Sequence, residues 1–454
     1  MKKLFLLFVL AVFVYGQSAF DDGGFSFESE EASVPSLSWS AFMEFEPRIF
    51  PHSNAPAEWE LIQALDLSFA YEKEYYTVKG TIKADDDTLT DFLDELTASV
   101  FLGRLQLHAG KQKVVWGKGD QVHLVDWLNS DDYRDFIFPD YQRRRLATEM
   151  LRLNYVVGPY SWNSSLELVW APKFTPMRFA ESALWRPAAL NTLESLAPQL
   201  AASGFAIQYE EYEKLSDSQF AARFNNSFAG FDWGISYYKG RMRIPALQFI
   251  TPSIENPQAA GVNIIYNPVQ VLGFEWSTAI SKLNLRGEIS RLITDDADGV
   301  KPHILNPKWG LLVGADASLP IHNLSVNIQY QRDFVAEDDK ITKTAYEQQL
   351  GTMLYQIGVD PALLGLASLD AYYENHFITG VLSDSFFRGR LKPEIQWVMN
   401  VDGEDQMLTL KLDTELRESF HLISLYRWFD GDQGTVFGQY NKNDFASLRL
   451  EVRF

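Results

Sequence analysis

Apolar and polar side chains alternate along much of the chain. In the stretch SLSWSAFMEFE, the apolar residues run from Leu37 through Trp39 to Phe45, and serine or glutamate fills most of the positions between them. The same alternation recurs in FDWGISY at 231–237 and in NLSVNIQYQ at 323–331. A period of two predicts β-strands with one apolar face and one polar face.

Further strands of this kind are predicted throughout the sequence. They lie at 64–72, 75–84, 97–103, 104–115, 149–157, 161–170, 218–228, 270–279, 283–289, 309–318, 389–399, 407–413 and 418–428. Several span about nine to eleven residues, which is the length that a tilted strand needs to cross a bilayer.

The segments between the predicted strands are of two kinds. Short turns such as GPY at 158–160 and AG at 229–230 join some neighbours. Long insertions separate others, at 116–147, 172–215, 240–260, 292–308, 333–370 and 429–444. Outer-membrane barrels have short periplasmic turns and long extracellular loops, whereas a soluble sandwich has comparable loops at both ends.

These patterns predict an all-β fold: a single transmembrane antiparallel β-barrel of about 16–18 strands, with long extracellular loops and short periplasmic turns. The apolar face of each strand would meet lipid, and the polar face would line the lumen. The aromatic content of 14% suits the aromatic girdles of such barrels. A soluble secreted β-protein is the alternative that the alternation leaves open.

Three segments show helical periodicity: 86–96, 181–203 and 344–358. We expect loop helices that fold over the barrel mouth; the alternative is a plug inside the lumen.

The first residues, MKKLFLLFVLAVFVYGQSA, predict a secretory signal peptide at 1–19, followed by the barrel at 20–454. Lys2 and Lys3 precede an apolar run from Leu4 to Val14, which is shorter than the ~20 residues that a spanning helix needs.

Charge and composition exclude several functions. The formal net charge of −20 argues against binding of nucleic acid. The chain has no cysteine, so it has no disulfide and no thiolate metal site, and its seven histidines are scattered. The sequence contains no HExxH, no G-x-S-x-G, no P-loop and no paired-cysteine motif. A hydrolase built on His108 or His421 with a nearby strand serine is the weaker alternative. We therefore expect no enzyme, no catalytic residue, no metal and no cofactor.

The densest cluster of charge lies between the predicted strands 104–115 and 149–157. The candidate constriction residues are Asp126, Asp131, Asp132, Asp135, Arg143, Arg144 and Arg145. If this loop folds inward, opposed carboxylates and guanidiniums create a transverse field across the lumen. If it stays outside, the same groups form surface salt bridges that contribute little.

Around this cluster the sequence resembles a poorly characterised family of Gram-negative, porin-like outer-membrane barrels. The resemblance rests on the strand LHAGKQKVVWG with GKGD after it, the loop LVDWLNSDDY and the segment LELVWAPKFTPMRF. It covers about the first third of the mature chain. It implies location in the cell outer membrane and a barrel architecture, with transport as an inference from the fold.

The stretch DFASLRLEVRF ends the sequence on a patterned strand. Leu450, Val452 and Phe454 are expected to face lipid and to act as the signal that the barrel-assembly machinery recognises. The expected function is passive passage of small solutes through a polar lumen. The alternative is a surface-exposed adhesin or structural barrel with an occluded lumen. Expected partners are outer-membrane lipid, the assembly machinery and small solutes, and a homo-oligomer is compatible with the sequence.

Overall fold

The structure is a computed structural model. It describes residues 36–454 except for 53–56, 86–91, 121, 135–140, 142, 183, 188–189, 192–194, 196, 199–200, 203–204, 251–259, 299–300, 302, 336–375 and 434. The predicted signal peptide, Asp135 and the predicted helix at 344–358 lie outside the described residues.

Eighteen antiparallel strands form one closed sheet. They are β1 (Ser36–Ile49), β2 (Trp59–Lys73), β3 (Tyr76–Asp85), β4 (Leu93–Leu102), β5 (Leu105–Gln112), β7 (Thr148–Val157), β8 (Ser164–Ala171), β11 (Gln219–Phe228), β12 (Phe231–Arg241), β15 (Pro268–Ile280), β16 (Leu283–Ile293), β17 (Lys308–Ser318), β18 (Ser325–Val335), β19 (His376–Ser383), β20 (Leu391–Asn400), β21 (Asp405–Arg417), β22 (Phe420–Asp430) and β23 (Phe445–Arg453). The predicted barrel class and its strand number are confirmed.

The barrel closes where β23 pairs with β1, with Val452 opposite Met43. Phe454 extends this pairing: its N–H donates to the carbonyl of Ala41 at 2.9 Å, and the Ala41 N–H donates to the Phe454 carbonyl at 3.1 Å. Closure removes the open edges that a flat sheet would expose. Because every strand pairs on both sides, the backbone polar groups at membrane depth are satisfied.

The predicted alternation sets the two faces of the wall. On β1, Trp39 and Ile49 point outward and are 68% and 62% exposed, whereas Glu46 and Arg48 point inward and are 0% and 1% exposed. On β23, Leu450 is exposed outside and Arg449 is buried inside. The apolar belt therefore lies on the outer surface and the charged side chains line the lumen, which is the arrangement that a lipid bilayer favours.

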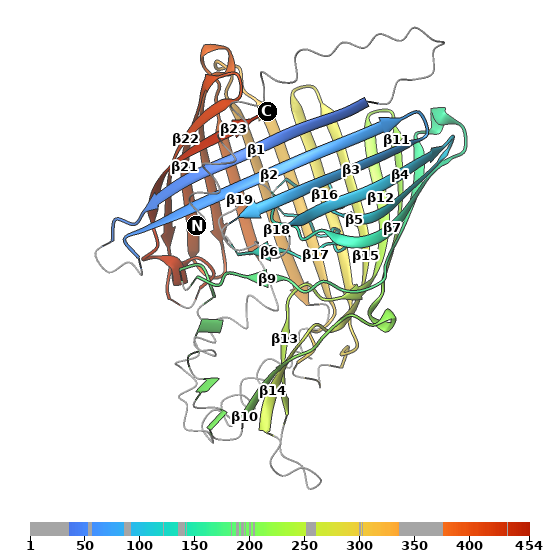
Figure 1. Ribbon diagram of the computed structural model, residues 1–454, viewed down its shortest axis with the longest axis horizontal. Coiled ribbons are helices and arrows are strands. Elements are labelled where there is room, and N and C mark those ends of the chain that lie inside the picture. The colour runs from blue at the N-terminus through green and yellow to red at the C-terminus, as the bar shows by residue number, and fades with distance from the viewer. Residues whose placement is uncertain are drawn as a thin grey trace.

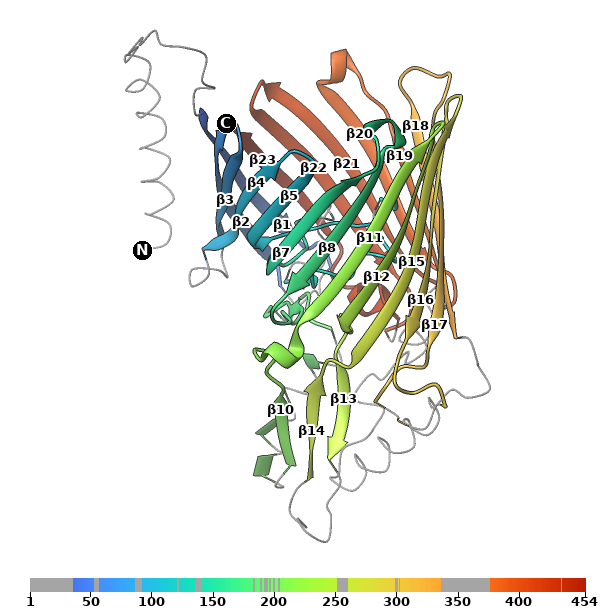
Figure 2. The same cartoon turned by 90° about the vertical axis from the view of Figure 1, so that its right-hand side faces the viewer.

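Short turns gather at the end of the barrel near the C-terminus (Figure 1). The turn between β11 and β12 has only Ala229 and Gly230, both with positive φ (52° and 80°), as a two-residue type I′ turn requires. The opposite end carries the long connections. There β10 (Phe205–Tyr209), β13 (Ala246–Ile250) and β14 (Ala260–Ile265) form a small sheet that projects away from the barrel (Figure 2).

Some local predictions were wrong. The helix predicted over 86–96 is contradicted at its end, because Leu93–Leu96 belong to β4. The projecting sheet occupies segments that were expected to be loop, and β19 was not predicted. Of the predicted helix at 181–203, the described residues 190–191, 195, 197–198 and 201–202 are helical. Within the described part of the chain, no helix is both long and apolar enough to span a membrane.

Candidate functional site

The candidate site is the connection between β5 and β7, here called the lumen loop, of which the structure describes residues 113–120, 122–134, 141 and 143–147. Its base is tied by Asn129, whose side-chain oxygen accepts the Val114 N–H at 2.8 Å. The Asn129 amide in turn donates to the carbonyls of Gln112 (3.1 Å) and Leu146 (2.8 Å). One buried side chain therefore joins the two strand ends that the loop leaves and re-enters.

The lumen loop folds inward and reaches the far wall of the barrel at Glu288 of β16. Oxygens of Glu288 accept the backbone N–H groups of Lys118 and Gly119, both at 2.7 Å, and of Leu124 at 2.6 Å. The N–H of Val125 adds a further contact at 3.2 Å. These partners are about 165 residues apart in sequence, so the contact exists only because the barrel is closed. The described part of the loop therefore lies inside the barrel.

Glycines in the wall make room for the loop. A Cβ atom built at Gly273 of β15 would lie 2.7 Å from Val125 Cγ1, and one at Gly310 of β17 would lie 3.2 Å from Leu124 Cδ1. Both positions point into the lumen, so a side chain there would meet the loop residue unless that residue shifted slightly.

Apolar side chains also pack between the lumen loop and the inner wall. One buried cluster joins the loop to the inner wall from β7 to β18; it contains Val114, Trp116, Val125, Trp127, Leu128, Met150, Val169, Ala171, Ala221, Tyr238, Met242, Val269, Val271, Leu292, Leu305 and Val335. Trp116 also donates its indole N–H to Glu167 of β8 at 3.1 Å. The loop thus fills one side of the lumen and leaves the side lined by β21, β22, β23, β1 and β2.

The predicted charged residues fall into two groups. Arg145 forms ion pairs with Asp126 (3.2 Å) and Asp131 (2.7 Å), with the Arg145 and Asp126 side chains fully buried. Asp132 pairs with Arg134 at 2.7 Å. Arg144 lies over the ring of Tyr141, at 5.0 Å from its centroid. These contacts hold the loop in its fold.

Burial opposes ionisation of the internal pairs, but their opposite charges outweigh it. Near Arg145 and Arg243, the pKa of Asp131 is lowered below its usual value in spite of burial. Burial alone would lower the pKa of Arg145, yet the Asp126 and Asp131 carboxylates raise it. Both groups are therefore charged at neutral pH, and the cluster is an internal salt bridge whose partners cannot be removed singly without a large cost.

Arg143, another of the predicted residues, reaches from the loop to the opposite, open wall. Its guanidinium lies 2.9 Å from Glu44 of β1 and 3.8 Å from Asp66 of β2. Although burial acts against its charge, these two carboxylates raise the pKa of Arg143.

The open wall carries a dense ladder of charge next to Arg143. Arg449 contacts Glu46 at 2.7 Å and Glu451 at 3.5 Å, and Arg453 contacts Glu451 at 2.7 Å. None of these wall residues was among the predicted constriction candidates, although the alternation of the last strand already placed Arg449, Glu451 and Arg453 on its predicted lumen face.

Between the loop and this wall lies a cavity of about 830 Å³, here called the charged cavity. Its lining is Phe42, Asp66, Val115, Asp120, His123, Tyr141, Arg143, Lys411, Asp413, Ile423, Leu425, Arg449, Glu451 and Arg453. Acidic and basic groups face each other across it, and such an arrangement creates a transverse field of the kind that selective pores use.

A second cavity of about 390 Å³, here called the apolar cavity, lies beyond the loop near the long connections. Its lining includes Leu124, Trp127, Met177, Met242, Leu292 and Leu305. His123 lines both cavities; its Nδ1 lies 3.3 Å from Glu288, and its ring centroid is 4.4 Å from that of Tyr141. The two cavities therefore share His123 as a lining residue.

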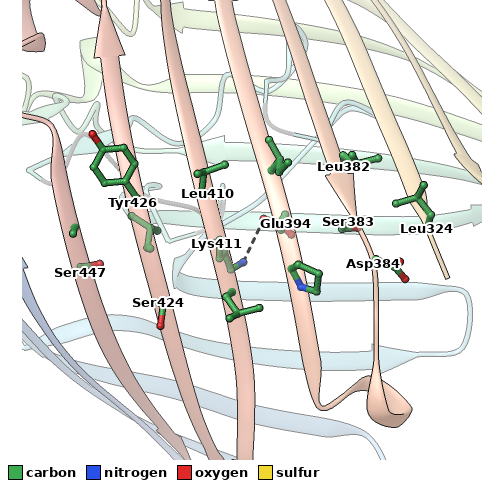
Figure 3. Close-up of a pocket in the computed structure, with 15 residues that line it drawn as sticks. Leu324, Leu382, Ser383, Asp384, Glu394, Leu410, Lys411, Ser424, Tyr426 and Ser447 are labelled. Atoms are coloured by element: carbon green, nitrogen blue, oxygen red, sulfur yellow. Dashed lines mark hydrogen bonds and ion pairs between the residues drawn. The ribbon is translucent and has the colours of Figure 1, made fainter. Parts of the chain in front are cut away.

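A further depression, of about 570 Å³, belongs to the outer surface and not to the lumen. Figure 3 shows Leu382, Leu410 and Tyr426 around it, on the lipid-facing side of neighbouring strands. Lys411 and Glu394, which form an ion pair at 3.4 Å, belong to the inward register of the same strands. We assign this depression to the lipid-facing surface.

The described residues contain no group of three or more His, Cys, Asp or Glu side chains placed to hold a metal ion. Ser99 Oγ and His108 Nδ1 are 2.7 Å apart on the wall, which is the type of pair that the hydrolase alternative needs. The third group that orients the base in a triad is not seen, because His108 Nε2 has no hydrogen-bond partner in the described structure.

Comparison with known proteins shows which folds this chain resembles. Residues 90–298 match the model of a family described as a protein of unknown function, DUF1302. OccK5 (OpdH) of Pseudomonas aeruginosa superimposes with a TM-score of 0.51 at 11% identity, over 94% of this chain and 99% of that one. The chain has the fold of a porin-like outer-membrane β-barrel.

Two other solved barrels resemble this porin-like barrel. OpdQ of P. aeruginosa gives a TM-score of 0.50 at 12% identity, over 94% of this chain and 99% of that one. Wzi of Escherichia coli, described as a carbohydrate-binding β-barrel involved in group 1 capsule assembly, gives 0.48 at 11% identity, over 92% and 84%. At these identities the likeness concerns the fold alone. No curated protein matches the sequence.

Proposed function

We propose that this porin-like barrel is a channel in the cell outer membrane that lets small solutes pass passively beside the lumen loop. The observation that carries the proposal is the charged cavity: the loop packs against one wall and leaves about 830 Å³ between itself and the opposite wall. No covalent step is needed for such a role, so the proposed protein is not an enzyme.

Selectivity in this proposal comes from the charges that face the cavity. Arg143, Arg449 and Arg453 lie among Asp66, Asp413 and Glu451. The balance of signs favours solutes that are polar or zwitterionic over those with a large net charge, because a single-sign ring is what selects strongly for one ion. The predicted partners, outer-membrane lipid and the barrel-assembly machinery, fit a barrel with an apolar outer belt.

A second candidate is a surface-exposed adhesin or structural barrel with an occluded lumen. A buried aromatic cluster favours it: Trp185 packs with Phe429, Tyr440 and Phe445 across the loop end of β22 and β23. Trp185 is also held by its indole N–H, which donates to Glu60 at 3.0 Å. The projecting sheet of β10, β13 and β14 would then be the surface that meets a partner.

Conductance separates the two candidates. Protein whose heat-modifiable migration in detergent proves that it is folded would be inserted into planar bilayers. The channel predicts reproducible conductance steps. Their absence from folded protein, in repeated insertions, contradicts the channel and favours the occluded barrel.

A further inference from the structure

The inner wall changes character near the long connections. Along most of β16 the inward side chains are charged or polar, as Glu288 and Ser290 are. At the end of the same strand the inward residue is Leu292, which is 4% exposed, and it faces the apolar cavity. Its neighbour on β15, Val271, is equally inward and buried.

Loop residues complete this apolar surface. Trp127 of the lumen loop, Met242 after β12 and Leu305 before β17 are all buried and line the same cavity. Met177, in the connection after β8, also lines the cavity and is partly exposed. Four separate connections therefore contribute apolar atoms to one concave site. Ligand sites are concave, mostly apolar and about 300–1,000 Å³ in volume, so a cavity of about 390 Å³ is of the size that holds a small organic molecule.

The charges at the cavity are already neutralised by one another. Lys308 lies 2.9 Å from Asp333. Arg243 lies 3.8 Å from Asp131, and its guanidinium stacks 4.9 Å from the centre of the Trp127 ring. An ionic ligand would have to give up its hydration without gaining an unpaired opposite charge, which is unfavourable in a site of this kind. Ser290 and Gln331 still offer neutral hydrogen-bonding groups at the edge.

We propose that the apolar cavity binds an uncharged, mostly apolar organic molecule that carries a hydroxyl or carbonyl group. The apolar body packs against Trp127, Met242 and Leu292, and the polar group meets Gln331 or Ser290. This inference rests on the proposed channel function. In that function the apolar cavity is the first binding site that a solute meets on its way to His123, Tyr141 and the charged cavity.

Site-directed thiols test the proposal, since the chain has no cysteine to interfere. Met177→Cys places a thiol in the apolar cavity, and Val115→Cys places a matched one in the charged cavity. Both barrels would be folded into lipid nanodiscs and labelled with a maleimide in the presence of 2-naphthol. The expected result is that labelling of the Met177→Cys thiol slows about tenfold when the free probe is about ten times its dissociation constant, while the Val115→Cys thiol reacts at its original rate.

Two controls sharpen the result. The anion 2-naphthoate has the same rings with a carboxylate and should protect much less than 2-naphthol. Leu292→Gln, added to Met177→Cys in a barrel that still shows heat-modifiable migration, should remove the protection. Equal protection of both thiols, equal protection by the two probes, or none by 2-naphthol would each overturn the proposal.

The channel and the binding site can fail separately. Conductance without protection of the Met177→Cys thiol would support the channel and contradict the binding site. Protection without conductance would support the binding site and contradict the channel.

Discussion

Glu288 on the inner wall of β16 accepts a 2.6 Å hydrogen bond from the backbone N–H of Leu124, 164 residues earlier in the chain. Glu288 also accepts the backbone N–H groups of Lys118, Gly119 and Val125, and so forms one polar attachment of the lumen loop to the far wall. The ion pair of Asp120 with Arg286 is a second attachment. A carboxylate that accepts several N–H groups is a strong anchor because each bond is assisted by charge.

Glu288→Ala should release the lumen loop. It leaves four backbone N–H groups without their acceptor, and each buried unpaired group costs about 1–3 kcal/mol. The loop should leave the wall, and single-channel conductance should rise by about twofold because the loop no longer obstructs the lumen. Planar-bilayer recording measures this change.

Glu394→Gln is the matched control, because Glu394 is another inward carboxylate but contacts Lys411 and Gln396 on the wall. It should keep the original conductance. Unchanged conductance in a folded Glu288→Ala barrel would show that Glu288 is not needed to hold the loop, and that its other contacts, among them the ion pair of Asp120 with Arg286, are sufficient.

A disulfide should lock the same loop in place. A Cβ at Gly273 would lie 3.1 Å from Val125 Cβ, close to the separation that disulfides need after a small shift. Gly273→Cys combined with Val125→Cys should therefore cross-link on oxidation, seen as a thiol count that falls to zero. Val125→Cys with Gly380→Cys, on the outer face of β19, should keep both thiols. A free thiol pair in the first variant would contradict the inward position of the loop.

The barrel was predictable because the signal is local. One-sided burial imposes a period of two on each strand, and strands such as 37–45 show it without reference to any partner. β19 was not predicted because its two faces are equally apolar. Phe377 and Val381 face inward, and Ile378 and Leu382 face outward, so the sequence does not alternate between apolar and polar residues. The period of two also did not predict where a strand begins, as at Leu93, the first residue of β4.

The site was predictable only in part. The loop was conspicuous by its charges, and Arg143 does reach the wall. However, nothing local distinguishes Arg143, which meets Glu44, from Arg145, which is buried against Asp126. Their difference depends on which residues the closed barrel brings opposite them. The partners Glu44 and Glu288 lie 99 and more than 160 residues away, at distances in sequence over which periodicity says nothing.

Removing the charge of Arg143 should make the channel more selective for cations. Arg143→Gln removes a guanidinium that contacts Glu44 and Asp66, while Arg449 still lies 3.6 Å from Glu44. The lining of the charged cavity loses one positive charge, and its carboxylates then attract cations more strongly. The reversal potential in a salt gradient should shift in the direction of cation selectivity.

Arg388→Gln controls for the loss of one positive charge, because Arg388 lies in the short turn Phe387–Gly389 outside the charged cavity. Its reversal potential should equal that of the unmodified protein. A shift of the same size in both variants would mean that net charge, and not the cavity, sets selectivity.

Acid should loosen the lumen loop through Asp131. Its pKa in the folded protein lies below the ordinary 3.8, since Arg145 and Arg243 outweigh the effect of burial. The stabilisation is complete above the ordinary pKa and is lost as the pH falls through the lower, folded value. Thermal stability of the folded barrel, followed by heat-modifiable migration between about pH 5 and about pH 2, should fall across this window.

Asp131→Asn should lower stability at neutral pH, because it leaves Arg145 with one carboxylate fewer, and should flatten the acid dependence in the same window. Asp402→Asn, at an exposed aspartate in the turn between β20 and β21, should keep the original profile. An acid dependence that survives Asp131→Asn unchanged would place the responsible group elsewhere.

Deleting Phe454 should impair assembly of the barrel. The residue closes the seam with two backbone hydrogen bonds to Ala41, and its ring lies 6.4 Å from that of Phe420 on the outer surface. Loss of these contacts exposes the edge of β1 where closure begins. The expected result is a sharp fall in heat-modifiable, membrane-integrated protein, with the remainder periplasmic and degraded. Phe454→Tyr keeps the backbone bonds and an aromatic ring and should assemble normally. If the deletion variant integrates as well as Phe454→Tyr does, the terminal aromatic residue is not part of the assembly signal.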